Sequence, residues 1–216
     1  MPEALFAFDK AWREKGFFLL AGVDEAGRGP WAGPVSAAVV VLKPDTSWPE
    51  LNDSKKLTPD VREFLYGKIV AESLYYSVRM VTPDVIDKTN ILKATFQAMT
   101  EAIRSLEVEP GLILIDGNQR IPRLPARLQE PVVGGDAKSA SIAAASVLAK
   151  VTRDRYMIEA DKKFPQYRFA SNKGYGTAEH AEALKKFGPS PLHRRSFAPV
   201  RAALAPELPF ESAVSP

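Results

Sequence analysis

Short, almost entirely apolar runs constrain the fold of this chain more than any other feature. The runs at residues 17–23, 35–42 and 111–115 contain only apolar and small residues, and each is short for a buried helix. This pattern favours strands buried on both faces, because a half-exposed strand would alternate apolar and polar residues. Residues 75–81 and 131–133 predict two further strands. A sheet with both faces covered needs helices on each side, so we expect an α/β fold with a mixed five-stranded sheet flanked by helices.

Helical spacing fills the intervals between these runs. The segment 90–106 carries apolar residues three or four positions apart, which predicts an amphipathic helix. Asp136 is expected to open a long helix that continues to about Phe164. Shorter helices are expected at 3–14, 59–73 and 178–187. Residues 1–164 are expected to form the core, and residues 165–216 a C-terminal helical extension with a Pro-rich tail packed on it or frayed.

The rarest residue types exclude several classes of chemistry. The chain of 216 residues contains no cysteine and only two histidines, His180 and His193. Disulfide frameworks, thiolate nucleophiles and sulfur-containing or histidine-rich metal sites are therefore excluded. A metal ion here must be held by oxygen ligands, which favours hard cations such as Mg²⁺ or Mn²⁺.

The charge balance permits a nucleic-acid partner without requiring one. Lys and Arg number 29 against 26 Asp and Glu, giving a formal net charge of +3 and a pI near 9.0. No apolar segment approaches the roughly 20 residues of a membrane span, and the N-terminal residues lack the pattern of a signal peptide. We therefore expect a cytoplasmic protein with no membrane contact.

Carboxylates stand at the ends of three apolar runs, where hydrophobic side chains would be expected. Asp24 and Glu25 end the first run, Asp116 ends the fourth, and Asp136 follows the fifth at an expected helix N-cap. If the first and fourth strands are parallel neighbours, their acids converge at the edge of the sheet where ligands of α/β proteins collect. Clustered buried carboxylates repel one another. No Lys or Arg is interleaved at these strand ends, so we expect a divalent cation to supply the positive charge.

Each acid alone has a simpler interpretation. Asp136 is most simply a helix cap, and Asp116 in an Asp-Gly-Asn sequence is most simply a turn former. The adjacent pair of Asp24 and Glu25 is harder to explain this way, because Gly27 follows and neither acid is needed for a turn. Only the combination of the four acids supports a metal site.

The segment 26–34 favours neither helix nor strand, and it contains Gly27, Arg28 and Gly29. Glycines let backbone amides approach a ligand closely, and arginine supplies a charged fork, which together suit a phosphate or a sugar. The alternative is a plain tight turn. A mononucleotide phosphate loop is excluded, because the Gly-x-x-x-x-Gly-Lys-Ser/Thr spacing is absent.

Two further loops carry donors typical of nucleic-acid contacts. One contains Ser54 and Lys55, and the other contains Lys173 and Tyr175. Their hydroxyl, amide and ammonium groups suit phosphates, and an aromatic ring between two glycines can stack on a sugar or base. The alternatives are a solvated loop for the lysines and a loop anchor for the tyrosine.

The end of the chain adds a histidine and two arginines whose roles are less defined. His193 is interpreted as structural. Arg194 and Arg195 either extend a basic surface or are simply solvated.

Taken in order, these motifs resemble one known family. The sequence Gly22-Val-Asp-Glu-Ala-Gly-Arg-Gly-Pro-Trp-Ala-Gly-Pro-Val35 resembles the opening signature of type 2 ribonuclease H, or ribonuclease HII, in its bacterial form. The resemblance continues, in the family's order, through 52–57, 115–118, 135–139, 143–155 and 172–177. It spans about residues 17–197. Trp31, where the family more often has a smaller apolar residue, and the tail after Ala198 depart from the pattern.

The resemblance implies an RNase H-like fold with a C-terminal helical extension, and endonucleolytic cleavage of the RNA strand of RNA–DNA hybrids. It also implies cleavage on the 5′ side of single ribonucleotides embedded in duplex DNA, as in ribonucleotide excision repair. The implied mechanism is two-metal-ion hydrolysis with Mg²⁺ or Mn²⁺, leaving 3′-hydroxyl and 5′-phosphate ends. Asp24, Glu25, Asp116 and Asp136 match the family's catalytic, metal-binding acids.

The same resemblance implies that the loops bind substrate. The Gly27-Arg28-Gly29 loop matches the loop that reads the ribose 2′-hydroxyl, and Tyr175 matches the tyrosine that packs at the junction sugar. Ser54, Lys55 and Lys173 match regions near the backbone phosphates.

Two other functions stay open at this point. The chain could be a non-catalytic nucleic-acid-binding module, or a different metal nuclease on the same fold, such as a junction resolvase. The full set of acids argues against a pure binder, because negative charge near phosphates weakens binding. A monomer is expected. Contact with a replication clamp, the preferred cation, the balance between long hybrids and single ribonucleotides, and the role of the tail are left open.

Overall fold

The computed structural model describes residues 2–204. In chain order the helices and strands are α1 (Pro2–Glu14), β1 (Leu20–Ala26), β2 (Val35–Val41), α2 (Pro59–Glu72), β3 (Tyr75–Val81), α3 (Pro83–Lys88), α4 (Ile91–Arg104), β4 (Leu112–Asp116), η1 (Ala126–Leu128), β5 (Gln129–Val132), η2 (Gly135–Ala137), α5 (Ala140–Lys163), η3 (Pro165–Tyr167), α6 (Phe169–Asn172), α7 (Ala178–Phe187) and α8 (Ala198–Leu204). Side-chain caps fix several helix starts, as at Thr58 before α2 and Asn90 before α4.

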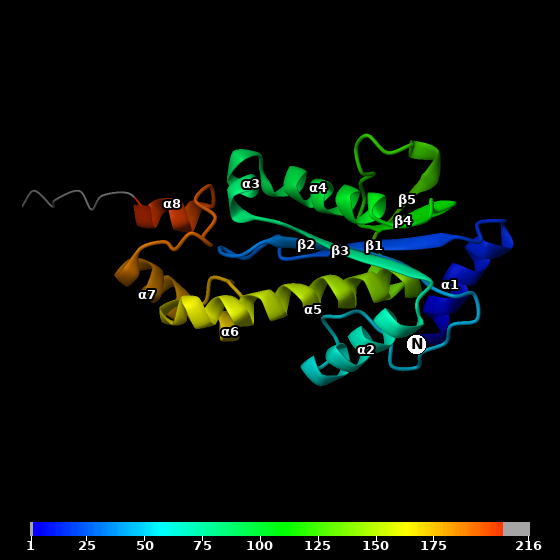
Figure 1. Cartoon of the computed structure of the whole chain (residues 1–216), viewed down its shortest axis with the longest axis horizontal. Helices are drawn as coiled ribbons and strands as arrows, with labels where there is room; N and C mark the ends of the chain where they lie inside the picture. Colours follow the sequence, from blue (N-terminus) through cyan, green and yellow to red (C-terminus); the bar gives the residue numbers. More distant parts are fainter. Residues whose placement is uncertain (1, 205–216) are drawn as a thin grey trace, which may run out of the picture.

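The strands form one mixed sheet in the order β3-β2-β1-β4-β5 (Figure 1). β2 is antiparallel to both β1 and β3, whereas β4 is parallel to both β1 and β5. Val23 of β1 is opposite Ile115 of β4, so the next residue of each strand reaches the same edge of the sheet. The predicted mixed, five-stranded sheet flanked by helices is confirmed.

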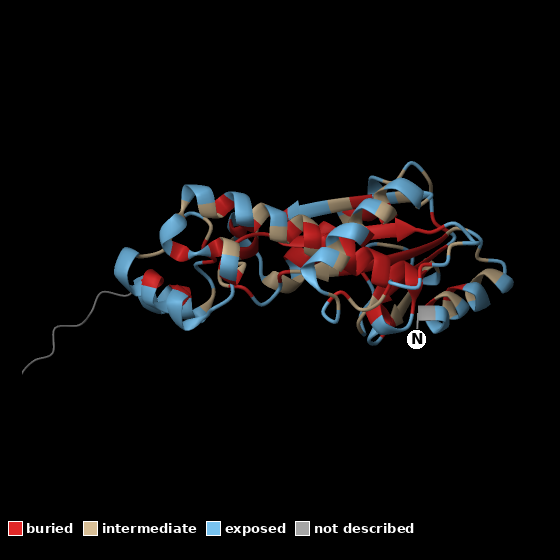
Figure 2. Ribbon diagram, turned by 90° about the horizontal axis from the view of Figure 1, so that it is seen from below, coloured by how far each residue is buried: buried red, intermediate tan, exposed pale blue. Residues whose placement is uncertain are grey.

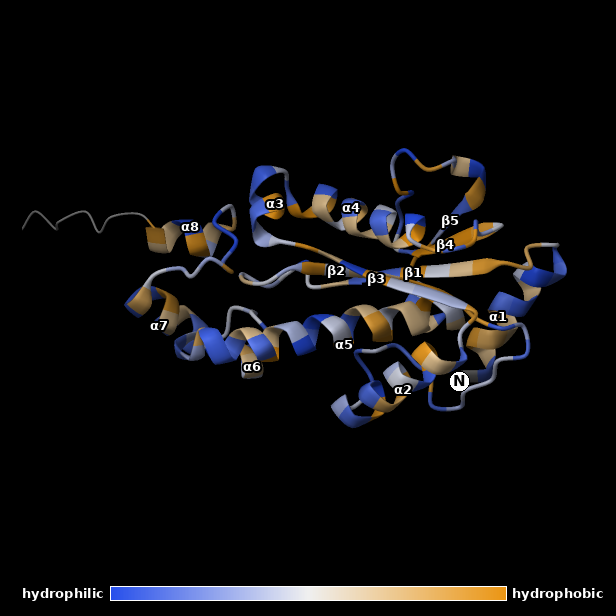
Figure 3. Ribbon diagram, in the orientation of Figure 1, coloured by the Kyte–Doolittle hydropathy of each residue, from blue (hydrophilic) through white to orange (hydrophobic). Residues whose placement is uncertain are grey.

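Helices cover both faces of this sheet (Figure 1). α5 packs on β1 and β2 from one side, and α4 packs on β2 and β3 from the other. Side chains alternate along β1, so Ala21 and Val23 join the core shared with α4, whereas Leu20 joins the core shared with α5. Buried residues gather along the central strands and the facing part of α5 (Figure 2), and apolar residues follow the same strands (Figure 3).

One glycine sets the distance between β1 and α5. A Cβ atom built on Gly22 would lie 2.1 Å from the carbonyl carbon of Ser141, in the first turn of α5. No side chain can occupy that space, so only glycine lets the helix approach the strand this closely. The start of α5 is therefore held directly beneath the strand that carries Asp24.

The first strand differs from its predicted range. β1 covers Leu20–Ala26 rather than residues 17–23, so Asp24 and Glu25 belong to the strand instead of following it. The apolar run indicated which residues are buried, but it did not show where the strand ends. Pairing with β2 continues past the run, with Glu25 opposite Ala37. The two acids are consequently held by sheet hydrogen bonds rather than by a loop.

The fifth strand and the long helix also begin at other residues than predicted. β5 covers Gln129–Val132 rather than 131–133. α5 begins at Ala140, not at Asp136, because the Ser139 hydroxyl caps it by accepting the backbone amide three residues on. Asp136 lies in the separate turn η2, so its carboxylate is not used as the helix cap.

The C-terminal helices gather at the end of α5 that lies farthest from α1 (Figure 1). Their small core includes Met157, Tyr167 and Phe169, and Ala32 joins it from the loop between β1 and β2. The C-terminal segment thus packs directly against the loop that follows Asp24 and Glu25.

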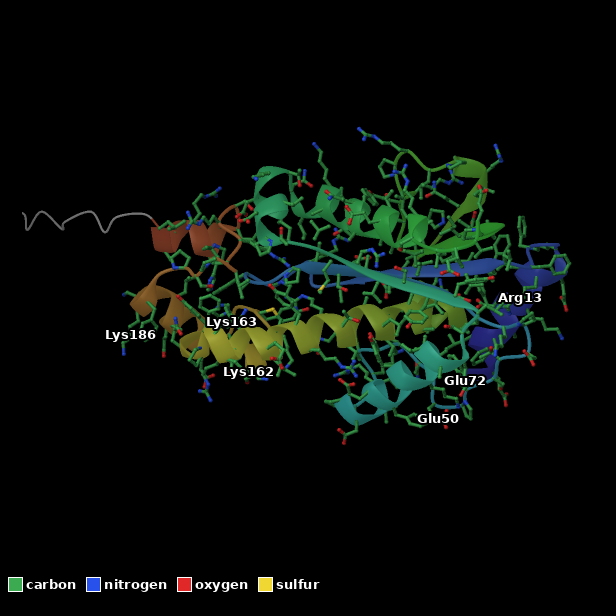
Figure 4. All side chains as sticks on the ribbon, in the orientation of Figure 1. Arg13, Glu50, Glu72, Lys162, Lys163 and Lys186 are labelled. Carbon is green, nitrogen blue, oxygen red and sulfur yellow. The ribbon has the colours of Figure 1, made fainter. Side chains whose placement is uncertain are left out.

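The outer surface of this end carries charged side chains of both signs, and Lys162 pairs with Glu159. Lys162 and Lys186 point outward from α5 and α7 (Figure 4). Among residues 2–204, no helix combines the length and the apolar character needed to cross a membrane. The predicted boundary at residue 165 stays a prediction, and residues 205–216, which hold most of the Pro-rich tail, lie outside the described residues.

Candidate active site

Asp24 and Asp116 lie on adjacent parallel strands, at the carboxyl end of each. Alternation along the strands projects both side chains from the face of the sheet that α5 covers, as it does Leu20 and Leu114. Asp24 is only 4% exposed. Burial, reinforced by the charges of Glu25 and Asp116, raises the pKa of Asp24 well above its ordinary value. Burial also raises the pKa of Asp116.

Glu25 projects from the opposite face, toward α4. Its Oε1 accepts a hydrogen bond from Nη1 of Arg28 at 3.2 Å, and the two side chains line a small cleft with Asp116 and Thr95. Burial raises the pKa of Glu25, and the positive charge of Arg28 opposes this rise. Asp116 therefore lies between the two acids of β1, with Asp24 on one side of the sheet and Glu25 on the other.

Asp136 reaches the cluster from the turn η2. The backbone amide of Gly135 donates to Oδ1 of Asp116 at 2.6 Å, which ties the turn to the end of β4. Oδ2 of Asp136 accepts from Nζ of Lys55 at 3.0 Å, and this hydrogen bond raises the pKa of Lys55. Side-chain cations therefore reach two of the four acids from loops, which the sequences of the strand ends did not indicate.

Asp9 of α1 fixes the turn and the helix behind Asp136, and sequence reasoning missed it. Its carboxylate is fully buried and accepts hydrogen bonds from the hydroxyls of Ser139 and Ser141, each at 2.6 Å, and from the backbone amide of Ser141 at 2.8 Å. Burial raises the pKa of Asp9. A polar residue on the apolar face of the first helix was the only available signal.

The donor set fits a hard divalent cation in charge and in chemistry. Among residues 2–204, neither the buried Asp24 nor the half-buried Asp116 forms an ion pair, although the charge of Lys55 acts on both. Oxygen donors with this much negative charge suit Mg²⁺ or Mn²⁺. No group of three or more Asp, Glu or His side chains in the described range is arranged to hold an ion as it stands. Cation binding would therefore exchange some of the present contacts, such as that of Lys55, for metal bonds.

The Gly27-Arg28-Gly29 loop meets the loop of Tyr175 next to these acids. A Cβ atom on Gly29 would lie 3.7 Å from Cε1 of Tyr175, and the tyrosine is 45% exposed. The amides of Trp31 and Ala32 donate to the carbonyl of Gly174 at 2.8 and 3.3 Å, which joins the two loops through their backbones. Two segments that are remote in sequence thus form one surface.

Ser54 and Lys173 face inward more than the sequence suggested. Ser54 is buried, and its hydroxyl lies 2.7 Å from that of Ser146 on α5. The ammonium group of Lys173 donates to the carbonyl of Ala170. Of the residues expected near phosphates, Lys55 is the most open, with 76% of its side chain exposed.

The C-terminal residues His193 and Arg194 are both buried. His193 lies within hydrogen-bond distance of His180, with 2.9 Å between the two Nε2 atoms, which suits the structural role expected for it. Arg194 is fully buried, so the expectation of a surface residue was wrong. Its guanidinium, like that of the equally buried Arg153, binds backbone carbonyls of the Gly27–Pro34 loop.

Fold and site together define a class of protein. Clustered carboxylates on two central parallel strands, beside loops with exposed donors, characterise a metal-dependent nuclease of the ribonuclease H fold.

Comparisons with known proteins give the family. The family model described as Ribonuclease HII matches residues 21–200. A ribonuclease HII of Endomicrobium trichonymphae is 54% identical over 196 residues, which cover 91% of this chain and 93% of that protein. The chain therefore belongs to the ribonuclease HII family, as its motifs predicted, and is a metal-dependent ribonuclease H that acts on RNA–DNA hybrids.

Solved structures of ribonucleases H are similar to this chain in fold. The ribonuclease H2 of Pyrococcus horikoshii superposes with a TM-score of 0.69 at 29% identity, covering 85% of this chain and 96% of that one. Bst-RNase HIII in complex with Mn²⁺ gives a TM-score of 0.70 at 18% identity, covering 94% and 73%. The second likeness shows the fold alone.

Proposed function

We propose that this chain cleaves both the RNA strand of RNA–DNA hybrids and the 5′ side of single ribonucleotides embedded in duplex DNA. The products are proposed to carry 3′-hydroxyl and 5′-phosphate ends. The observation that carries the proposal is the meeting of Asp24 and Asp116 at the ends of adjacent parallel strands, with Asp136 tied to Asp116 through Gly135. Sequence positions far apart thus supply one negatively charged centre.

The four acids are proposed to hold two divalent cations. When bound, Mg²⁺ or Mn²⁺ would supply an activated water and stabilise the leaving 3′-oxygen. The protein's part is to hold Asp24 and Asp116 adjacent, with Glu25 and Asp136 on either side, so that a bound cation would favour their ionised forms. No histidine or hydroxyl nucleophile is required.

Lys55 is proposed to move between Asp136 and substrate. Its ammonium group pairs with Asp136, yet most of its side chain is exposed. Once a cation neutralises Asp136, the lysine is free to bind a backbone phosphate. Ser54, buried against Ser146, then holds the lysine's loop rather than touching phosphate itself.

The surface formed by the Gly27-Arg28-Gly29 loop and Tyr175 is proposed to detect the ribose. The 2′-hydroxyl is the group that separates RNA from DNA, and recognising it needs backbone donors at close range. The missing side chain of Gly29 leaves that access open, and the exposed ring of Tyr175 lies beside it.

A single gel experiment tests the proposal. Labelled RNA–DNA hybrid, duplex DNA with one ribonucleotide and an all-DNA four-way junction are each incubated with Mg²⁺, Mn²⁺ or a chelator. We expect cleavage of the first two with either cation, none with chelator, and a product end on the 5′ side of the ribonucleotide. Absence of product in every lane would favour a binding module, and cleavage of the junction would favour a resolvase.

The remaining expectations on partners and localisation stay predictions. We propose a monomeric protein that works in the cytoplasm. Contact of a replication clamp with the C-terminal tail stays open, and most of that tail lies outside the described residues.

A further inference from the structure

Two arginines are buried close to the candidate active site without a partner of opposite charge. Arg153 is 1% exposed and Arg194 is fully buried. Neither forms an ion pair with a carboxylate of residues 2–204. Burying a charge in this way is costly unless each donor is satisfied. Both guanidinium groups therefore need acceptors nearby.

Backbone carbonyls supply those acceptors, and most belong to one loop. Arg194 donates to the carbonyls of Gly27 at 2.6 Å, Arg28 at 3.0 Å and Gly33 at 3.0 Å. Arg153 binds other carbonyls of the same loop, those of Ala32 at 3.0 Å and Pro34 at 2.9 Å.

Arg153 also reaches the second loop. Its Nη1 donates to the carbonyl of Lys173 at 2.9 Å, two residues before Tyr175. A Cβ atom on Gly27, whose φ is +93°, would lie 2.0 Å from Nε of Arg153. The guanidinium of Arg153 is therefore packed directly between the two loops.

These contacts fix the direction of two amides. The carbonyl of Gly27 shares a peptide unit with the amide of Arg28, and the carbonyl of Arg28 shares one with the amide of Gly29. In a trans peptide the two groups point in opposite directions, and the described chain has no cis bonds. Because both carbonyls are turned inward to Arg194, both amides are turned away from it. Neither amide donates to an acceptor within residues 2–204.

We propose that Arg194 and Arg153 are positioning residues that aim the amides of Arg28 and Gly29 at the ribose 2′-oxygen and hold this loop against Tyr175. The inference deepens the proposed function, since it rests on ribose detection by that loop. The arginines themselves touch no substrate. A guanidinium suits the task because its donors form a rigid planar fork, whereas a lysine ammonium cannot hold three carbonyls in one plane.

The test compares binding of ribonucleotide-containing and all-DNA duplexes. The variants Arg194→Lys and Arg153→Lys keep the positive charge but lose the planar set of guanidinium donors. Arg155→Lys is the matched control, because Arg155 lies on the same helix as Arg153 but is half exposed and pairs with Glu63. Affinities for a duplex with one ribonucleotide and for the same duplex without it are measured by fluorescence anisotropy in Ca²⁺. The ratio of the two dissociation constants reports ribose detection.

We expect the parent and the Arg155→Lys control to prefer the ribonucleotide duplex. In Arg194→Lys and in Arg153→Lys, the ratio of the two dissociation constants should move about tenfold toward one. The affinity of each variant for the all-DNA duplex should change by less than about threefold. An unchanged ratio in both variants would overturn the inference, because a merely structural defect would weaken the two duplexes alike. A parent that shows no preference would instead count against the proposed function.

A measurement on the parent protein covers variants that fail to fold. Hydrogen exchange of the Arg28 and Gly29 amides is compared in complexes with the two duplexes. We expect both amides to be protected only by the duplex that contains the ribonucleotide. Equal protection in the two complexes, or no protection in either, would refute the proposed direction of the amides.

Discussion

Buried charges in this protein are of two kinds, and their surroundings separate them. Arg153 and Arg194 have their donors satisfied by carbonyls, so their charges serve the architecture of a loop. The buried Asp24 and the half-buried Asp116 form no ion pair among residues 2–204, and burial raises the pKa of both. A carboxylate that the fold leaves uncompensated is one that a cation can stabilise. That contrast supports the proposed role of the two acids in binding a cation.

Tyr175→Ala tests the role of a single ring. We expect kcat/KM for a lone ribonucleotide in duplex DNA to fall by on the order of 10- to 100-fold, because stacking at the sugar is lost. The melting temperature should change little, since the side chain is half exposed.

Tyr76→Ala is the control for this change. Tyr76 is 41% exposed on β3, an edge strand on the far side of β2 from β1. Its removal should leave kcat/KM within about twofold of the parent. If both variants cleave at the parent rate, Tyr175 is only a loop anchor.

At the scale of elements, α5 connects the site to the rest of the molecule. Its first turn lies against Gly22 of β1, and its start is bound by Asp9 of α1. Farther along the same helix, Arg153 holds the Gly27–Pro34 loop. A shift of this one helix would therefore move Asp136 and the Gly27–Pro34 loop together.

Asp9→Ala should destabilise the protein by about 2–4 kcal/mol. The change leaves two serine hydroxyls and one backbone amide at the start of α5 buried without their acceptor. Urea unfolding monitored by circular dichroism measures the free energy of unfolding. Lys10→Ala, at an exposed position of the same helix, should change it by less than about 0.5 kcal/mol. Equal small effects would show that Asp9 does not support α5.

The buried pair of histidines predicts a loss of stability in mild acid. Nδ1 of His193 accepts the Ser190 amide, so its Nε2 donates to His180, whose Nδ1 donates to the carbonyl of Tyr175. Burial, with the adjacent His180, lowers the pKa of His193 to about 4, whereas an unfolded histidine titrates near pH 6.5. The stabilising contribution is complete above pH 6.5 and is lost as the pH falls toward 4, because the unfolded chain takes up the proton first.

We therefore expect the parent to lose about 2 kcal/mol more unfolding free energy between pH 7.5 and pH 5 than His193→Gln does. Urea unfolding at the two pH values measures this difference. The comparison uses the change in unfolding free energy with pH in each protein rather than the absolute free energies. The carboxylates contribute equally to both changes, so their contribution cancels. Parallel slopes would show that His193 is protonated at similar pH in the folded and unfolded states.

For the whole molecule, the sequence predicted the parts of the site that lie at strand ends. The meeting of Asp24 with Asp116 could be inferred, because the ends of parallel neighbours share an edge. Asp136 and Ser139 are both good cap residues, and only the contact between Asp9 and Ser139 explains which one is used.

Arg153 and Arg194 could not be predicted in the same way. Their partners are backbone carbonyls, which every residue carries, so no sequence pattern marks them. Ser54 likewise looks like a phosphate contact until the fold places it against Ser146. Contacts made through the backbone between remote segments are the part of the site that only the structure could supply.

The most direct test of the whole account is the cleavage rate of Asp24→Asn on duplex DNA containing one ribonucleotide, at saturating Mg²⁺. The substitution removes a carboxylate from the centre of the acidic cluster and almost no volume. We expect the single-turnover rate to fall at least about 1,000-fold, while duplex affinity and melting temperature stay close to those of the parent. Cleavage within a few-fold of the parent rate by this folded variant would contradict the assignment of Asp24 and its neighbours as the cation-binding centre.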